Sequence, residues 1–125
     1  MGIDELLERS RAGLDRLTPD AAQAAVAEGA LIVDTRPVDQ RRAQGVIAGA
    51  AVVGRNVLEW RVDPTSGWHD SALVGRRLIV MCAEGYSSSL AAATLREIGV
   101  SGATDMIGGF LAWRDAGLPV EPCPD

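Results

Sequence analysis

Short apolar runs alternate with stretches of helical character through most of this chain. Four such runs, each only a few residues long, cover 30–33, 49–53, 77–82 and 103–107. Continuous apolar runs of this length are typical of strands that are covered on both faces. Helical stretches are predicted at 3–14, 18–28, 37–44, 86–98 and 109–116. The alternation predicts an α/β fold in which a parallel sheet carries helices on both faces.

The composition is that of an ordinary globular domain. The chain has 125 residues, 47% of them apolar and 23% charged, which is enough for one domain with a single core. No apolar stretch approaches the roughly 20 residues of a membrane span, and the acidic start lacks the features of a secretory signal. The net charge of −5 argues against nucleic acid as a partner, because phosphate binding needs a basic face. Two cysteines cannot build a disulfide framework, so we expect a cytoplasmic protein.

Cys82 ends the third apolar run and precedes the helix predicted at 86–98. In a parallel sheet the ligand site lies beyond the carboxyl ends of the strands, which is where this thiol is expected. Backbone N–H groups of a first helical turn lack partners within the helix and can point at the sulfur, an arrangement that favours the thiolate. Cys82 is therefore a candidate nucleophile. A buried, inert cysteine is the alternative, because free cysteines are commonly buried.

Three ordered segments resemble the rhodanese-like (sulfurtransferase) family in its single-domain form. The first is 31–36, a strand that ends in Asp-x-Arg; the second is the loop that begins at Cys82 with the alanine-rich helix after it; the third is 108–114, with a Gly-Gly-x-x-Ala-Trp pattern. The resemblance covers about 17–120 and implies a three-layer domain whose parallel sheet has about five strands. The extension before it, 1–16, has apolar residues at helical spacing and is expected to pack on the domain or on a partner; 121–125 forms a tail.

The resemblance implies that Cys82 is the catalytic residue. Its thiolate would take the outer sulfur of an anionic donor, thiosulfate or a persulfide, and hold it as a persulfide. A thiol or a cyanide-like acceptor would then remove the sulfur, and a protein that carries sulfur is a further expected partner. This double displacement needs no cofactor. The expected substrate-binding loop consists of Ala83, Glu84, Gly85, Tyr86, Ser87 and Ser88.

The loop departs from the family at one position. Active members commonly carry Arg or Lys where Ser87 stands, and a charged hydrogen bond from that cation is worth about 1.5–3 kcal/mol. Glu84 adds a negative charge that opposes thiolate formation and anion docking. We therefore expect thiosulfate to be a weak donor. Arg55 is the first candidate for an accessory cation and Arg61 the second, because both follow the second apolar run; the alternative for each is an ion pair with a nearby carboxylate such as Glu59.

Other polar residues have lower weight as functional candidates. By resemblance, Asp34 and Arg36 form a structural pair that ties the loop after the first strand to the Cys82 loop. His69 is the only histidine and no ligand cluster surrounds it in the sequence, so no metal site is predicted. Cys123 is interpreted as a free thiol of the tail, with resolution of an oxidised Cys82 as its alternative role.

Two other functions stay open at this point. A non-catalytic or redox-sensing rhodanese-like module would bind a partner or react with oxidants at Cys82, and the missing loop cation favours it. A phosphatase or arsenate reductase of the Cys-x5-Arg kind uses the same fold, but Ser88 stands where its arginine is required. Persulfide formation separates sulfur transfer from the binding module, and hydrolysis of an aryl phosphate identifies the phosphatase.

Overall fold

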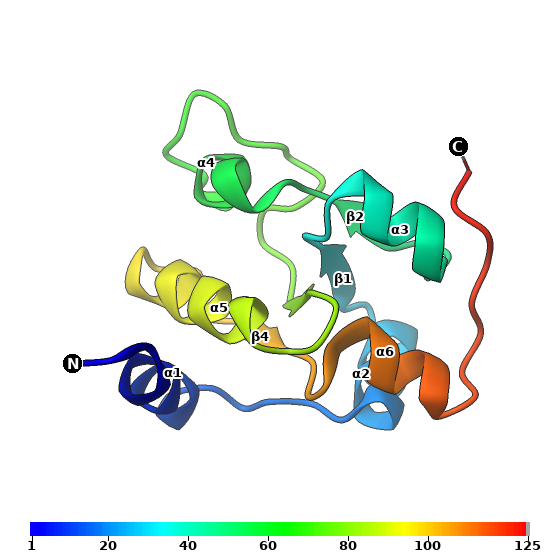
Figure 1. Ribbon diagram of the computed structural model, residues 1–125. Helices are drawn as coiled ribbons and strands as arrows, with labels where there is room; N and C mark the ends of the chain where they lie inside the picture. The colour runs from blue at the N-terminus through cyan, green and yellow to red at the C-terminus, as the bar shows by residue number, and fades with distance from the viewer. Residues whose placement is uncertain (125) are drawn as a thin grey trace.

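The computed structural model describes residues 1–124, which form one parallel sheet of four strands (Figure 1). The order is β2-β1-β3-β4, with β1 at Leu31–Asp34, β2 at Ala51–Val52, β3 at Leu78–Met81 and β4 at Thr104–Asp105. Each pair of neighbouring strands is parallel. The predicted α/β class with a parallel sheet is confirmed; β2, β3 and β4 lie within apolar runs, and β1 extends one residue beyond its run, to Asp34.

The described residues form four strands rather than the expected five. At the edge beside β4, Leu17 makes a single parallel bridge to Met106. The bridge cannot extend toward the C-terminus because α2, Pro19–Ala27, begins two residues later. The Thr18 hydroxyl accepts a hydrogen bond from the Ala21 N–H at 3.2 Å and so caps that helix. The fifth strand is thereby reduced to one bridge.

Helices connect the strands near the predicted positions. Besides α2, they are α1 at Ile3–Ala12, α3 at Val38–Gln44, α5 at Ser87–Glu97 and α6 at Gly109–Asp115. The segment after β2, for which no helix is predicted, forms a 3-10 turn, η1 at Arg55–Val57, and a short helix, α4 at Leu58–Val62. Its two end residues are four positions apart and buried, so they share one helical face that packs on the core. None of the helices within 1–124 has both the length and the apolar character that crossing a membrane requires.

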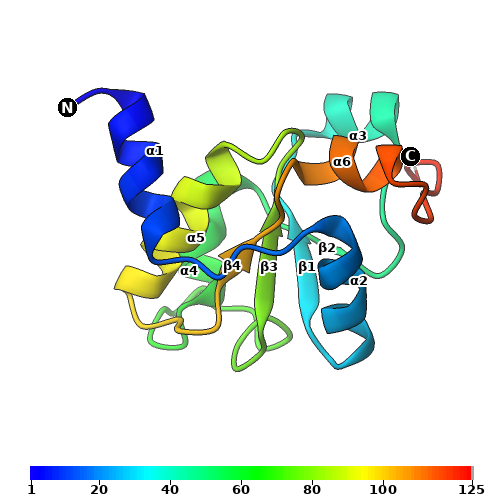
Figure 2. The same ribbon diagram turned by 90° about the horizontal axis from the view of Figure 1, so that it is seen from below.

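The sheet lies between two layers of helices, and α1 lies outside them against α5 (Figure 2). On one face of the sheet, Val33, Leu78 and Val80 pack against α4 and α5. On the other face, Ile32 and Ile79 pack against α2 and α6. Successive side chains of a strand point to opposite faces, so a sheet covered on both sides needs the continuous apolar runs seen in the sequence. The three-layer arrangement is confirmed.

The carboxyl ends of β1 and β3 lie next to each other at one edge of the sheet. Their register pairs Asp34 with Met81, so the segments that follow both strands start side by side. Thr35 reinforces this pairing, because its N–H and its hydroxyl each donate to the Met81 carbonyl at 2.9 Å. The residue after Met81 is Cys82, and its loop is therefore fixed against the loop that follows β1.

Candidate active site

Cys82 follows directly after β3, and the residue is 8% exposed. Its Sγ accepts a hydrogen bond from the Gly85 N–H at 3.1 Å. Gly85 has a φ of 86°, a backbone conformation that glycine adopts without the cost that a side chain imposes. The tight turn at this glycine brings a backbone donor back to the sulfur three residues earlier, which stabilises negative charge there.

Two effects of opposite sign act on the pKa of Cys82. Burial raises the pKa, because the thiolate loses hydration. Hydrogen bonds from the Ser88 and Ser87 side chains, and from the backbone N–H groups of Ser88 and Gly85, lower it. The hydrogen bonds outweigh burial, and the pKa of Cys82 lies below the ordinary value of a thiol. The first turn of α5 thus favours a thiolate, the reactive form of cysteine.

The carbonyl groups at the start of the loop are bound by the first turn of α6. The Phe110 N–H donates to the Cys82 carbonyl at 2.9 Å, and the Leu111 N–H donates to the Ala83 carbonyl at 3.1 Å. Gly109 makes this close approach possible, because a Cβ at this position would lie 2.5 Å from the Cys82 oxygen. Its φ of 64° also favours glycine. The second glycine of the Gly-Gly pattern therefore lets α6 close against the cysteine loop.

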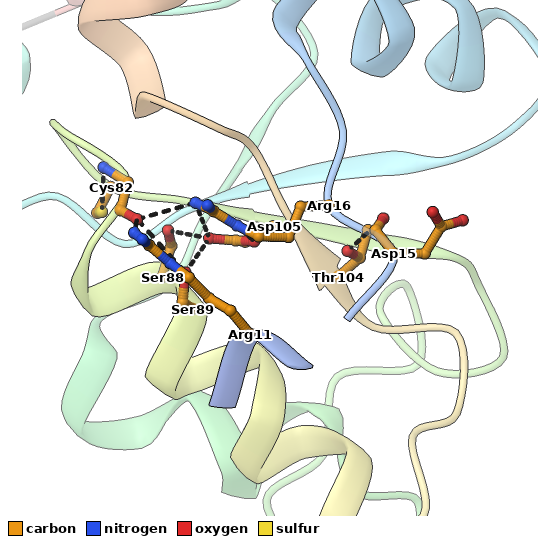
Figure 3. Close-up of polar contacts among 9 residues, drawn as sticks. Arg11, Asp15, Arg16, Cys82, Ser88, Ser89, Thr104 and Asp105 are labelled. Carbon is orange, nitrogen blue, oxygen red and sulfur yellow. Dashed lines mark hydrogen bonds and ion pairs between the residues drawn. The ribbon is translucent and has the colours of Figure 1, made fainter. Parts of the chain in front are cut away.

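Behind the loop, the buried carboxylate of Asp105 accepts four hydrogen bonds (Figure 3). The Ser88 and Ser89 hydroxyls donate to its Oδ2 at 2.8 and 2.7 Å. Arg16 donates from Nε to Oδ1 at 2.8 Å and from Nη2 to Oδ2 at 3.2 Å. This network joins the end of β4, the first turn of α5 and the segment between α1 and α2.

Two guanidinium groups of the N-terminal segment meet at the carbonyl oxygen of Gly85; Figure 3 labels the two residues, Arg11 and Arg16. Arg11 donates to this oxygen from Nη2 at 2.7 Å, and Arg16 donates to it from Nη2 at 3.1 Å. Arg11 also donates from Nε to the Ser89 hydroxyl at 3.0 Å. Its guanidinium lies over the ring of Tyr86, 5.5 Å from the centroid, within the range of a cation–π contact.

Interpretation of the sequence missed the residues of this network that lie outside the loop. A signal exists for Arg11, because Leu7, Arg11 and Leu14 are spaced by four and three residues and share the inward face of the α1 region. Asp105 gives a second signal, since it is a carboxylate inside an apolar run. Arg16 follows α1 in an irregular segment, and no local pattern distinguishes it from other arginines.

A cavity of about 310 Å³ opens beside the thiol. Its lining comes from the segments after β1 and β3 and consists of Thr35, Arg36, Pro37, Gln40, Cys82, Ala83, Glu84, Tyr86 and Ser87. Glu84, Tyr86 and Ser87 are exposed and can meet a ligand directly. Of the predicted loop residues, Gly85 and Ser88 lie outside the lining and act on the sulfur through hydrogen bonds.

Asp34 and Arg36 form a buried ion pair, 2.7 Å between Oδ2 and Nη2. The same guanidinium donates to the Gly45 carbonyl at 2.9 Å and lies 3.9 Å from the centroid of the Phe110 ring. The pair therefore ties the loop after β1 to the end of α3 and to α6. Its support reaches the cysteine loop through Phe110, whose N–H holds the Cys82 carbonyl.

Arg55 and Arg61, the candidates for an accessory cation, do not line the cavity beside Cys82. Arg55 forms an ion pair with Glu59, one turn later, at 2.8 Å, which is the alternative expected for it. Arg61 is exposed on α4. Among the described residues that line the cavity, Arg36 is the one cation, and most of its N–H groups are already engaged in hydrogen bonds.

His69 and Cys123 lie outside the cavity lining at Cys82. The Nδ1 of His69 is 2.6 Å from the Ser66 carbonyl oxygen in the segment between α4 and β3. Cys123 is half-buried and lines another cavity, which α3 and the C-terminal segment border. Both cysteines are free thiols. Within residues 1–124, no group of three or more His, Cys, Asp or Glu side chains is arranged to hold a metal ion.

Known proteins resemble this chain in sequence and in structure. A protein-family model described as Rhodanese-like domain matches residues 18–116, whereas no curated protein matches. A protein of unknown function from Rhodopseudomonas palustris, described as a possible tyrosine phosphatase, is 33% identical with a TM-score of 0.89; the match covers 97% of this chain and 95% of that one.

Two more distant structures share the fold. A thiosulfate sulfurtransferase from Pseudomonas aeruginosa is 24% identical with a TM-score of 0.67, and the match covers 86% of this chain and 19% of that one. A rhodanese-like domain from Anabaena is 24% identical with a TM-score of 0.66, and the match covers 86% of this chain and 79% of that one. At this level of identity the likeness concerns the fold alone.

Proposed function

Because the chain belongs to the family of rhodanese-like domains, we propose that it is a sulfurtransferase that carries sulfane sulfur on Cys82. One observation carries this proposal: the Cys82 thiol borders a cavity while the Gly85 N–H and the first turn of α5 favour its thiolate. A buried structural cysteine would need neither the donors nor the cavity. The same donors can stabilise the charge of a persulfide, which also sits on sulfur.

The reaction consists of two displacements at sulfur. In the first, the Cys82 thiolate attacks the outer sulfur of the donor, a new S–S bond forms, and the donor's own S–S bond breaks. With thiosulfate the leaving group is sulfite, which departs with the electron pair of the broken bond and leaves an anionic persulfide on Cys82. In the second, a thiolate or cyanide attacks the outer sulfur and the Cys82 thiolate is released. Charge and electrons balance in both steps, so no cofactor is involved.

The cavity favours a persulfide over thiosulfate as the donor. The divalent thiosulfate anion has to enter beside the exposed carboxylate of Glu84, and Ser87 offers a neutral hydroxyl instead of a cation. Neutral hydrogen bonds are weaker than charged ones by about 1 kcal/mol or more. A low-molecular-weight persulfide carries less charge and is less affected by both features. A protein that delivers sulfur in the same chemical form is equally compatible with the open side of the cavity.

The test is an intact-mass spectrum after incubation with thiosulfate or with a low-molecular-weight persulfide. We expect a gain of one sulfur atom that a reductant removes, with more adduct from the persulfide. Cys82→Ser should abolish the adduct, and Cys123→Ser, the matched control, should keep it. An adduct that follows Cys123 instead, or no adduct from either donor, would contradict the proposal and favour a binding or redox-sensing module.

A phosphatase is the second candidate, because the protein from Rhodopseudomonas palustris is described as a possible tyrosine phosphatase. The loop argues against it. Ser88 stands where a Cys-x5-Arg loop has its arginine, and this serine is buried and donates to Asp105. No loop cation is therefore available to bind phosphoryl oxygens. We expect no hydrolysis of an aryl phosphate, and turnover that Cys82→Ser abolishes would reverse the order of the two candidates.

A further inference from the structure

The N-terminal segment lies outside the family match but contacts the cysteine loop. The match begins at residue 18, whereas α1 and the residues after it bring Arg11 and Arg16 to the Gly85 carbonyl. None of the residues of α1 is fully buried, so the helix adds little to the core. The match to the Rhodopseudomonas palustris protein covers 97% of this chain and so includes most of α1, while the two more distant structures each cover 86%.

We propose that Arg11 and Arg16 are positioning residues of the Cys82 loop and that α1 serves to deliver Arg11 to it. Gly85 is the residue that they hold. Its N–H is the donor on the sulfur, and its carbonyl is the acceptor for both guanidinium groups. Glycine is the most flexible residue of a chain and has no side chain through which packing can hold it. Fixing its carbonyl therefore limits the conformations in which its N–H leaves the sulfur.

Ser88 depends on Arg16 through the carboxylate that the two residues share. Its hydroxyl has one proton, which it donates to Asp105 at 2.8 Å, while its side chain also contributes to the stabilisation of the Cys82 thiolate. Arg16 and Ser89 supply Asp105 with other donors. With these donors in place, the carboxylate stays satisfied when the Ser88 proton turns toward a thiolate.

Arg11 also brings positive charge to a loop that lacks its own cation. It stacks on Tyr86, the residue just before Ser87, and within residues 1–124 no carboxylate is within ion-pair distance of it. Arg16, in contrast, is paired with Asp105. The charged groups around the loop are two ion pairs and two single residues. The pairs are Arg36 with Asp34 and Arg16 with Asp105. The single residues are Glu84 in the loop and Arg11 on α1. Arg11 is the cation of this set that no carboxylate of residues 1–124 pairs with.

This inference rests on the proposed role of Cys82 as the reacting thiol, but its test does not require sulfur transfer. The measurement is the pH dependence of Cys82 alkylation by iodoacetamide in a Cys123→Ser chain, followed by peptide mass. In the parent chain the hydrogen bonds favour the thiolate. The rate of alkylation should therefore reach half of its high-pH plateau at a lower pH than for a small free thiol; this pH is the midpoint. Loss of a positioning residue should move that midpoint toward higher pH.

The test variant is Arg11→Met, which keeps the length of the side chain and removes its donors and charge. We expect the midpoint to rise by about half a pH unit or more, which is about a threefold loss of thiolate below the midpoint. Arg9→Met is the matched control, because Arg9 is exposed on the same helix and contacts only Met1 among the described hydrogen bonds. Its midpoint should equal that of the parent chain.

Arg11→Lys keeps the charge but can reach only one of the two acceptors, so its midpoint should rise less. If Arg11→Met fails to fold, as judged by circular dichroism, the midpoint of Arg11→Lys tests whether Arg11 positions the loop. A folded Arg11 variant with the parent midpoint would overturn the proposal. A shifted midpoint in a chain that takes no sulfur from any donor would uphold the positioning role and reject the sulfurtransferase instead.

Discussion

At the scale of single residues, the reactivity of Cys82 is set by a few neighbours with distinct tasks. Gly85 turns the backbone so that an N–H reaches the sulfur, and Ser87 and Ser88 add hydrogen bonds from the start of α5. These contacts favour the thiolate but provide no full positive charge within the cavity. The chain therefore has the means to form a nucleophile and lacks the usual means to attract a dianion.

Replacement of Ser87 by arginine should restore that attraction. Ser87 is exposed and lines the cavity, so a longer side chain fits without disturbing the core. We expect Ser87→Arg to raise kcat/KM for thiosulfate by about tenfold or more, because a charged hydrogen bond is worth about 1.5–3 kcal/mol. The rate of thiocyanate formation from thiosulfate and cyanide measures this kcat/KM.

The control is Ser71→Arg, which adds the same charge at an exposed position outside the cavity lining. It should leave the rate with thiosulfate within about twofold of the parent, since exposed charges are screened by salt. Equal gains in both variants would mean that net charge, and not a cation in the loop, limits the reaction.

At the scale of elements, α6 acts as a clamp on the cysteine loop. The N–H groups of Phe110 and Leu111 hold two loop carbonyls, and Gly109, the first residue of α6, lacks the side chain that would keep the two backbones apart. Gly109→Ala should therefore lower the free energy of unfolding by the left-handed strain of about 1–2 kcal/mol plus an overpacking cost of about 1–3 kcal/mol. Urea unfolding measures the sum.

Gly117 at the other end of α6 provides the matched comparison. Its φ is 79°, and a Cβ there would have no heavy atom within 4 Å. Gly117→Ala should therefore show the strain without the overpacking and cost less than Gly109→Ala. The Gly109 variant should also lose Cys82 reactivity, which the Gly117 variant should keep. Equal losses of stability and reactivity would mean that the close approach of α6 is unimportant.

Elements and contacts differed in how far the sequence could predict them. The strands and five of the helices follow from local signals, namely continuous apolar runs, the Thr18 cap and helical spacing. The helix α4 is short and carries Trp60 and Arg61 on exposed positions, so its two buried residues gave too weak a pattern. The contacts of Arg16 with Asp105 span 89 positions, and no local pattern records a contact between segments so far apart.

At the scale of the whole molecule, Asp105 joins three segments that are distant in sequence. Arg16→Met would leave its carboxylate buried without a cation, which should lower the free energy of unfolding by about 3 kcal/mol. The double variant Arg16→Met with Asp105→Asn should lose less, because a neutral amide oxygen still accepts from Ser88 and Ser89 and needs no ion pair. Urea unfolding of the three chains tests this, and a double variant that is less stable than Arg16→Met would contradict it.

The fastening of the cysteine loop from both ends of the chain has a consequence for synthesis. Ribosomes release a chain from its N-terminus onward, so Arg11 and Arg16 emerge early, whereas Phe110 and Leu111, which hold the Cys82 and Ala83 carbonyls, emerge after the loop itself. A nascent chain that ends before α6 has the contacts of Arg11 and Arg16 with the loop but lacks those of Phe110 and Leu111. We therefore expect the thiol to reach its full reactivity only once nearly the whole domain has been made, which would limit oxidation of the unfinished chain.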